Sequence, residues 1–342
     1  MREIGSEFHF EKTNIGEGIL TPSDVVDSCF VFSGRTAIET VLKNELDIHK
    51  ALLPSYCCDS MIEPFRQAGI NVSFYPVSYK NGLKVNLIIP EDVDCILWCN
   101  YFGFSVSMPD MSEFLARGGI VIEDITHSFY SRGQSHEQST YLVASLRKWE
   151  PLLCGGYCAS RKGAMKHVPV HGPMESFVTM KMSAMNLKRR YLDGDTEVEK
   201  SIFLGMFSEA NDWLADNYTG LSIDQYSKNY LLHVDYRAHQ SQRISNSIIL
   251  YEGLKNNSKI KFLFDLEDME CPLFVPVVIQ DGKRDLIRKK LIEQSIYCPV
   301  HWPHPKEKCE SNLYDIELSL ICDHRYDKEA MRRIVDAINN EL

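Results

Sequence analysis

Short apolar runs alternate with amphipathic stretches through the first half of the chain. Short apolar runs predict buried strands, and apolar residues three or four positions apart predict helices that cover a sheet. The predicted strands are residues 28–33, 51–53, 71–76, 95–100, 119–123, 141–145 and 156–159, and the predicted helices are residues 34–46, 59–68 and 111–117. Strands that alternate with helices in this way are typical of an α/β protein with a largely parallel sheet.

The second half has a different pattern. Helical periodicity dominates residues 174–217 and 223–254, and strands and helices then alternate again: strands at 274–279 and 296–300, helices at 285–294 and 328–342. The pattern predicts an N-terminal segment at residues 1–27, a large domain at 28–235, and a linking helix with a smaller α/β domain at 236–342.

Composition narrows the possible partners and the compartment. The chain has 342 residues, 44% of them hydrophobic, with 37 Lys and Arg against 47 Asp and Glu, a net charge of -10. Such a charge disfavours nucleic acid and anionic membranes as partners. The N-terminus lacks the basic start and apolar run of a signal peptide, no apolar stretch reaches membrane-spanning length, and the 11 cysteines fit a reducing compartment. We therefore expect a cytoplasmic protein.

Three predicted strands end in loops that carry reactive or ligand-binding side chains. Ligands of open α/β sheets bind beyond the carboxyl ends of the strands. The first loop reads Ser33-Gly34-Arg35-Thr36 and opens a predicted helix. Backbone N–H groups and the helix dipole favour a phosphate at such a place. An ordinary turn capped by Ser33 has the same sequence, so the loop alone does not identify a phosphate site.

The second loop places Asp124 directly after a predicted buried strand, with His127 three residues on. A carboxylate there suits a protonated ring nitrogen, and an imidazole suits a ligand hydroxyl. A capping aspartate and a packed histidine fit the same spacing equally well.

The third loop carries Lys148, three residues after Ser145 ends a predicted strand. A partly desolvated lysine loses its proton readily and attacks aldehydes, although most lysines on turns are simply solvated. Together the three loops offer a phosphate cradle, an acid for a pyridinium and an amine for an aldehyde. Pyridoxal 5'-phosphate presents those three features.

The chain resembles the fold type I pyridoxal-phosphate enzymes and, among them, the DegT-type sugar aminotransferases. The matching stretches are SGRTAI at 33–38, LLPSYCCDSM at 52–61, NYFG at 100–103, IEDITHS at 122–128, SLRKW at 145–149 and CPVHW at 298–302. The resemblance implies an α/β fold whose large domain holds a mostly parallel, seven-stranded sheet flanked by helices, with a smaller C-terminal α/β domain. It also implies a homodimer with shared active sites that moves an amino group from an amino-acid donor to a keto compound, such as a nucleotide sugar.

The resemblance also implies roles for individual residues. Lys148 holds the cofactor as a Schiff base, Asp124 pairs with the pyridine nitrogen, and His127 stands near the phenolic oxygen. The implied phosphate contacts are Ser33, Gly34, Arg35, Thr36 and Ser145.

The sequence departs from the family at two points. The step from Ser145 to Lys148 is shorter than in many sugar aminotransferases, which bears on the substrate rather than on the cofactor. Where the family often stacks an aromatic ring on the cofactor, the chain offers two alternatives, Tyr56 and Tyr101. Arg325 and His301 are candidate substrate contacts. The guanidinium of Arg325 can bind a carboxylate in bidentate fashion.

Three other hypotheses compete with transamination. A lyase or sugar dehydratase has the same fold, although retention of Lys148 favours transamination. A non-catalytic binding protein on this frame has no need to keep both Asp124 and Lys148. A zinc site is the third, from the spacing of Cys298, His301, His304 and Cys309. The prolines between these residues favour a structured loop, and we expect no metal.

Overall fold

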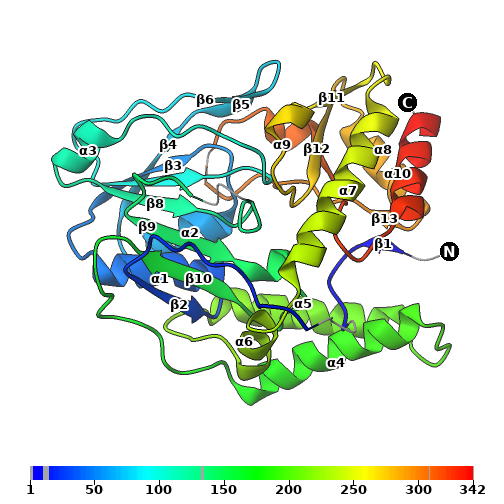
Figure 1. Ribbon diagram of the computed structural model, residues 1–342, viewed down its shortest axis with the longest axis horizontal. Helices are drawn as coiled ribbons and strands as arrows, with labels where there is room; N and C mark the ends of the chain where they lie inside the picture. Colours follow the sequence, from blue (N-terminus) through cyan, green and yellow to red (C-terminus); the bar gives the residue numbers. More distant parts are fainter. Residues whose placement is uncertain (1–2, 11–14, 132–134, 308, 342) are drawn as a thin grey trace. The chain divides into compact units, whose positions relative to one another are not determined.

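The structure is a computed structural model that describes residues 3–10, 15–131, 135–307 and 309–341. Its contacts divide the chain into two compact units. Unit 1 comprises Met1–Ser6, Asp47–Thr140 and Arg237–Leu342, and unit 2 comprises Glu7–Leu46 and Tyr141–Tyr236. Figure 1 labels the helices and strands of both units.

Four parallel strands form the sheet of unit 1. They are β3 (Lys50–Pro54), β4 (Asn71–Tyr75), β7 (Cys95–Cys99) and β8 (Ile120–Asp124). β3 pairs with β4 and β7, and β7 pairs with β8. β7 and β8 are buried along their whole length, as expected where both faces of a parallel sheet are covered. The carboxyl ends of these strands share one edge, so the loops that carry Tyr56, Tyr101 and His127 begin there.

Unit 2 contributes three strands whose register gathers two loops. They are β2 (Asp27–Val31), β9 (Tyr141–Ser145) and β10 (Gly156–Ser160). β10 is antiparallel to both of the others, so β2 and β9 run in the same direction. Gly156 pairs with Val31 on one side and with Ser145 on the other, which brings the ends of β2 and β9 to one place. α1 (Gly34–Asn44) starts there and packs on β9 and β10.

Two long helices dominate the rest of unit 2. α4 (Glu175–Leu192) and α5 (Lys200–Asp216) pack along one another, as the green ribbons of Figure 1 show. Phe203 and Phe207 of α5 meet Ala184 and Met185 of α4 in a buried cluster. The shorter α6 (Gln225–Leu231) follows, with Asp224 as its capping residue.

The C-terminal part of unit 1 is a small α/β layer. β12 (Val275–Ile279) lies between β11 (Ile260–Phe262) and β14 (Glu317–Leu320), all antiparallel. The N-terminal β1 (Ile4–Gly5) pairs in parallel with β13 (Ile296–Tyr297). The remaining elements are β5 (Val77–Tyr79), β6 (Leu83–Val85), α2 (Asp59–Gln67), α3 (Ser112–Ala116), α7 (Tyr236–Leu254), α8 (Arg284–Glu293), α9 (Leu313–Ile316) and α10 (Lys328–Glu341), with single 3-10 turns at Leu146–Lys148 and Leu266–Asp268.

The predicted α/β class is confirmed, since the described residues contain a seven-stranded sheet flanked by helices. Every helix and strand that the sequence pattern predicted is present to within a few residues of its predicted bounds. The pattern missed β1, β5, β6, β11, β14 and α9, all of which are short. The predicted domain boundaries at residues 27/28 and 235/236 stay predictions.

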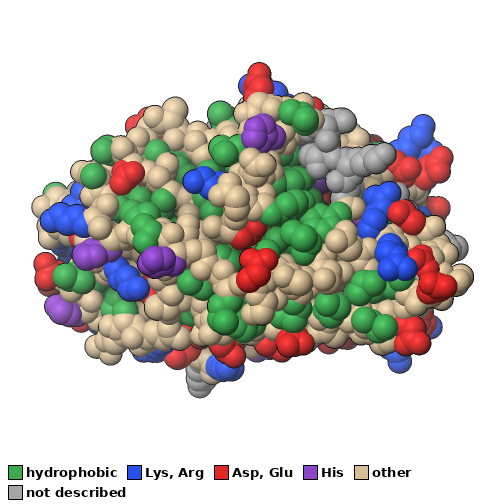
Figure 2. All heavy atoms as spheres, turned by 90° about the horizontal axis from the view of Figure 1, so that it is seen from below, with side chains coloured by type: hydrophobic (Ala, Val, Ile, Leu, Met, Phe, Trp, Pro, Cys, Tyr) green, Lys and Arg blue, Asp and Glu red, His purple; other side chains and the backbone are tan. Residues whose placement is uncertain are grey.

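In the part of the chain that the structure describes, no helix combines the length and apolar character that a membrane crossing requires. On the face drawn in Figure 2, Lys and Arg side chains are interspersed with Asp and Glu. This mixed surface agrees with the moderate negative charge of the sequence.

The turn after β7 is packed too tightly for a side chain at its glycine. Phe102 and Gly103 both have positive φ, 61° and 83°. A Cβ on Gly103 would lie 1.9 Å from the carbonyl oxygen of Cys271, whose own N–H donates to the Gly103 carbonyl at 3.2 Å. This turn fixes the position of the neighbouring Tyr101.

We expect Gly103→Ala to cost far more stability than Gly118→Ala. Gly118 also has positive φ (89°), but a Cβ there meets nothing within 4 Å. Gly118→Ala, the control, therefore carries only the left-handed backbone strain of about 1–2 kcal/mol. Gly103→Ala must also displace the backbone at Cys271, so we expect its total loss of stability to be about 4 kcal/mol or more. Urea unfolding of the two variants measures the difference, and equal losses would contradict this account of the turn.

Candidate active site

The phosphate loop of the sequence analysis forms the start of α1. Ser33 caps the helix: its Oγ accepts a hydrogen bond from the Thr36 N–H (3.2 Å). Thr36 is fully buried, and its Oγ1 donates to the Tyr218 carbonyl (2.9 Å). The first N–H groups of a helix have no acceptor within the helix, so a rigid capped turn of this kind suits an anion.

Small residues let this turn lie directly against the end of β9. A Cβ on Gly34 would lie 3.2 Å from the Cβ of Ser145. A Cβ on Gly156 would lie 2.3 Å from the carbonyl oxygen of Ser33, which no side chain tolerates. The structure thus brings Ser33, Gly34, Thr36 and Ser145 together at the ends of β2 and β9.

Lys148 projects from the 3-10 turn that follows Ser145. The turn is anchored, because the Leu146 N–H donates to the Gly155 carbonyl (3.0 Å) and the Trp149 ring is buried. Lys148 itself is exposed. The lysine therefore sits one short turn from the phosphate loop, on a backbone held by buried neighbours.

A carboxylate that the sequence analysis did not select lies within electrostatic reach of this lysine. Burial by itself raises the pKa of Glu7, but the charges of Lys181 and Arg147 outweigh it and lower that pKa to about 2, with Lys148 adding in the same direction. Lys181 Nζ lies 3.5 Å from Glu7 Oε2, and Asn211 Nδ2 donates to Oε1 (3.0 Å). Glu7 lies far from these residues in sequence, and no local pattern points to it.

Unit 1 carries Asp124, the carboxyl that the sequence analysis selected. Asp124 ends β8 and is buried, with a hydrogen bond from the Thr126 N–H to its Oδ1 (2.8 Å). Burial raises the pKa of Asp124 to about 6, against the hydrogen bonds from Thr126 that lower it. Such a carboxyl is a poor anion on its own and gains from a cationic partner.

Aromatic rings gather at the same edge of the unit 1 sheet. The Tyr56 and Tyr101 rings stack at 5.8 Å, and the Tyr101 hydroxyl donates to the Tyr56 carbonyl (2.7 Å). Trp302 contacts the Tyr56 ring (5.1 Å) and stacks on His127 (5.5 Å, 24°). The choice between Tyr56 and Tyr101 stays open, and Trp302 joins them as a candidate that the sequence analysis missed.

The two candidate histidines also meet. The ring of His301 lies edge-to-face on His127 at 5.4 Å, and His127 Nδ1 accepts a hydrogen bond from the Phe102 N–H (3.1 Å). His301 is buried and is held by Glu317 and Ser319 of β14. The sequence analysis did not select either of those residues.

Arg325 has other neighbours. Its Nε and Nη2 bind Asp323 in bidentate fashion (2.9 and 2.8 Å), and both groups are buried. The pKa of Asp323, which burial alone raises, is held well below its usual range by this guanidinium. Arg325 also lines a cavity of about 460 Å³ with Glu3, Gln242 and Arg333. A substrate carboxylate would have to compete with Asp323 for it.

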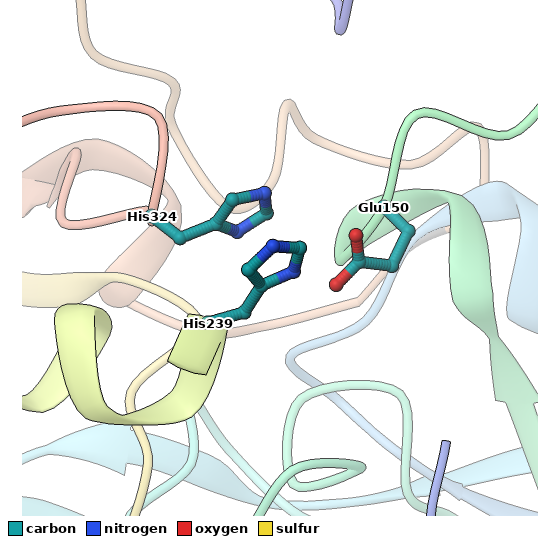
Figure 3. Close-up of side chains that lie close together, drawn as sticks. All are labelled: Glu150, His239 and His324. Carbon is teal, nitrogen blue, oxygen red and sulfur yellow. The ribbon is translucent and has the colours of Figure 1, made fainter. Parts of the chain in front are cut away.

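A pair of histidines near Arg325 was not predicted either. His239 of α7 and His324 stack face to face, with centroids 3.7 Å apart and an interplanar angle of 2°. Figure 3 shows these two rings; Glu150, also drawn there, belongs to unit 2.

The two histidines of the zinc hypothesis have separate partners. His301 Nδ1 lies 2.7 Å from Ser319 Oγ, and His304 Nε2 lies 3.0 Å from Asp315 Oδ1 on the surface. Burial raises the pKa of the Cys298 thiol to about 12, which opposes the thiolate that zinc requires. Among the described residues the four form no common group of ligand atoms.

Comparison with known proteins supports the fold assignment. No family model and no curated protein matches the sequence. Among solved structures, PseC of Helicobacter pylori, an aminotransferase involved in the biosynthesis of pseudoaminic acid, superposes with a TM-score of 0.62 at 14% identity, covering 99% of this chain and 99% of that one. The chain has the fold of the DegT-type sugar aminotransferases.

Two further structures of this fold agree. DesV of S. venezuelae, solved in complex with a ketimine intermediate, gives a TM-score of 0.60 at 14% identity over 95% of this chain and 91% of that one. A DegT DnrJ EryC1 StrS aminotransferase from Brucella abortus gives 0.59 at 14% identity over 95% and 92%. The DegT-type fold extends over both units, and the likeness at this identity is one of fold.

The raised pKa of Asp124 predicts a pH-dependent gain from Asp124→Asn. The unfolded carboxyl ionises near pH 3.8 and the folded one near 6, so the stability of the cofactor-free protein falls as pH rises between these values. A pKa shift of that size corresponds to about 3 kcal/mol of unfolding free energy. The wild type loses this stability as pH rises, whereas the variant, with a neutral amide at this position, does not. Urea unfolding without cofactor should show the variant more stable than wild type by about that amount at pH 8.

The gain should shrink toward zero below about pH 4, where both states of the wild type are protonated. Asp47→Asn, at an exposed position, is the matched control and should show no such pH dependence. If the difference in unfolding free energy between Asp124→Asn and wild type stayed constant across this pH range, burial would not be what raises the pKa of Asp124.

Proposed function

We propose that the chain is a pyridoxal-phosphate-dependent aminotransferase that moves an amino group from an amino-acid donor to a keto compound, in the sugar series. The observation that carries the proposal is the junction in unit 2, where the capped start of α1 lies against Ser145 and Lys148 follows one turn later. The DegT-type fold supports it.

The residues present suit this cofactor. The capped turn from Ser33 to Thr36, with Ser145, would hold the phosphate, because the glycines leave its backbone accessible. Asp124 would hold the ring nitrogen, since burial raises the pKa of its carboxyl to about 6 and a cationic partner would favour the ionised form. His127 would face the phenolic oxygen. The aromatic group of Tyr56, Tyr101 and Trp302 would supply the ring contact.

When bound, the cofactor supplies an aldehyde that captures amines and a protonated ring that accepts electrons. Lys148 Nζ would provide the amine that anchors it, and the same Nζ would take and return the proton at the donor's α-carbon. Asp124 would keep the ring nitrogen protonated, and that positive charge would in turn favour the ionised carboxylate. Glu7, ionised at neutral pH, stabilises the cationic group of Arg147 beside the lysine.

Two other activities on the same fold make different predictions. A lyase or dehydratase would not retain the amino group of an amino-acid donor on the cofactor, and a lyase that acts on an amino acid would release it as ammonia. A non-catalytic binding protein would hold the cofactor and react with no amine. Single-turnover assays with a panel of amino acids, followed by detection of keto acid, of ammonia and of the amine form of the cofactor, distinguish the three.

We further propose a cytoplasmic homodimer with shared active sites. Apolar side chains on unit 2, among them Val170 (77% exposed), Val26 and Met174, are suited to burial against a second copy. Light scattering of the purified protein should give twice the chain mass of 39.3 kDa, and a monomer at micromolar concentration would contradict this proposal.

Lys148→Ala should abolish both the visible absorption of the reconstituted protein and all transamination. The reason is that Nζ alone provides the covalent anchor and the proton carrier. Lys162→Ala is the control, because Lys162 is an exposed lysine of the same unit that pairs with Glu45 (2.7 Å). If wild-type protein reconstituted with cofactor stays colourless, or if Lys148→Ala keeps its absorption, the proposed function is wrong.

A further inference from the structure

A buried carboxyl holds His301 at two points. Glu317 Oε2 accepts a hydrogen bond from the His301 backbone N–H (2.8 Å), and Glu317 Oε1 lies 2.5 Å from Ser319 Oγ. The same Ser319 Oγ lies 2.7 Å from His301 Nδ1. Glu317 and Ser319 are two apart in β14, so both side chains leave the strand on one face. The three groups form a continuous chain from carboxyl to imidazole.

No bulk water screens this chain. Glu317 and Ser319 have no exposed surface, and His301 is 4% exposed. The imidazole packs against the rings of Phe102 (5.6 Å) and Phe274 (4.8 Å), with the ring of His127 at 5.4 Å. In such surroundings the proton positions are decided by the hydrogen bonds themselves.

The serine hydroxyl has one proton, so its two hydrogen bonds must point in the same sense. If Glu317 is protonated, its O–H donates to Ser319, Ser319 donates to Nδ1 of His301, and the imidazole carries its proton on Nε2. If Glu317 is ionised, Ser319 donates to the carboxylate, accepts from Nδ1–H, and leaves a lone pair on Nε2. The state of the carboxyl therefore sets the tautomer of the histidine.

We propose that Glu317 and Ser319 are positioning residues that fix the tautomer of His301, so that at neutral pH its Nε2–H is a hydrogen-bond donor. The group suited to this donor is an oxygen acceptor, such as a hydroxyl or carbonyl oxygen. Only the identity of that oxygen rests on the proposed function.

The electrostatic surroundings of Glu317 favour the protonated form at neutral pH. Burial raises the pKa of Glu317 to about 8, against the hydrogen bonds from Ser319 and His301 and the charge of Arg284. Arg284 of α8 donates to the Glu317 carbonyl (2.7 Å), while Tyr56 and Cys298 face the carboxyl from two other segments. Between roughly pH 7 and pH 9 the carboxyl loses its proton, and the histidine tautomer should invert with it.

Histidine-selective ¹⁵N labelling of the full chain tests this directly, because two-bond correlations distinguish Nε2–H, Nδ1–H and doubly protonated rings. His301 is assigned among the 11 histidines by its loss in His301→Asn. Wild type should show the Nε2–H pattern at pH 6.5 and the Nδ1–H pattern at pH 9.5, with a midpoint near 8. A pattern that does not change over this range, or a doubly protonated ring at pH 6.5, would overturn the proposal.

Two variants separate a tautomer-setting role from a merely structural one. Glu317→Gln keeps the acceptor for the His301 N–H and presents an NH₂ donor to Ser319, so it should lock the Nε2–H pattern at every pH. Ser319→Ala should remove the transition by breaking the chain. Ser247→Ala is the control, because Ser247 is equally buried but bonds to the Arg243 carbonyl of its own helix. It should leave the His301 transition in place.

The outcome does not depend on the proposed function. If Glu317→Gln fails to fold, the pH titration of wild type and Ser319→Ala still decides the matter. A Glu317→Gln variant that titrates like wild type sinks the proposal even if the protein proves to be an aminotransferase. A colourless protein that shows the expected transition would remove the proposed function alone. In an active enzyme, turnover should fall above about pH 8 in wild type and stay level in Glu317→Gln.

Discussion

The arrangement of the candidate site depends on one close backbone contact, that of Gly156 with its two neighbouring strands. Its register joins Val31 to Ser145 through a residue that has no side chain, and its Cα lies against the Ser33 carbonyl. Any Cβ here would push β2 and β9 apart and carry the start of α1 away from Lys148. Glycine is thus required at position 156, because any side chain there would clash with the Ser33 carbonyl. The close approach of the two loops, on which their proposed chemistry depends, needs this residue.

Three buried carboxyl groups in unit 1 differ in how far their neighbours compensate for the loss of water. Glu123 is satisfied within the protein by Asn100 Nδ2 (2.8 Å), the His136 N–H (2.9 Å) and Ser139. Asp124, the next residue, points to the opposite face of the strand, and burial raises its pKa to about 6. Glu317 has a raised pKa near 8 and hydrogen bonds that suit a neutral acid. The neighbours of each buried carboxyl therefore indicate a different role: Glu123 is structural, Asp124 is suited to a cation, and Glu317 is suited to holding a proton.

The sequence predicted the parts of the fold and site that depend on local pattern. Apolar runs such as Cys95–Cys99 and Ile120–Asp124 identify strands because their burial on both faces requires unbroken apolar stretches. Ser33, Asp124 and Ser145 could be selected as candidates because each ends or follows a strand. Two contacts could not be predicted from the sequence, that of Glu7 with Lys181 and that of Glu317 with His301. Each joins distant segments of the chain, and the residue types alone suit solvated positions. Short strands such as β5 and β6 carry too few residues to show a period.

Two buried arginines of the C-terminal part of unit 1, Arg325 and Arg284, already have acceptors within the chain. Arg325 is bound by Asp323, and Arg284 donates to the carbonyls of Glu317 and Tyr314 (2.7 and 2.9 Å). Each guanidinium therefore has acceptors from its own chain, and recruiting one for a substrate carboxylate would break a buried bidentate or paired contact. His301, Tyr56 and Trp302 offer neutral donors and ring faces instead. Neutral donors bind hydroxyl and carbonyl oxygens without requiring a charge, so these three residues would suit a hydroxyl-bearing compound in the proposed reaction.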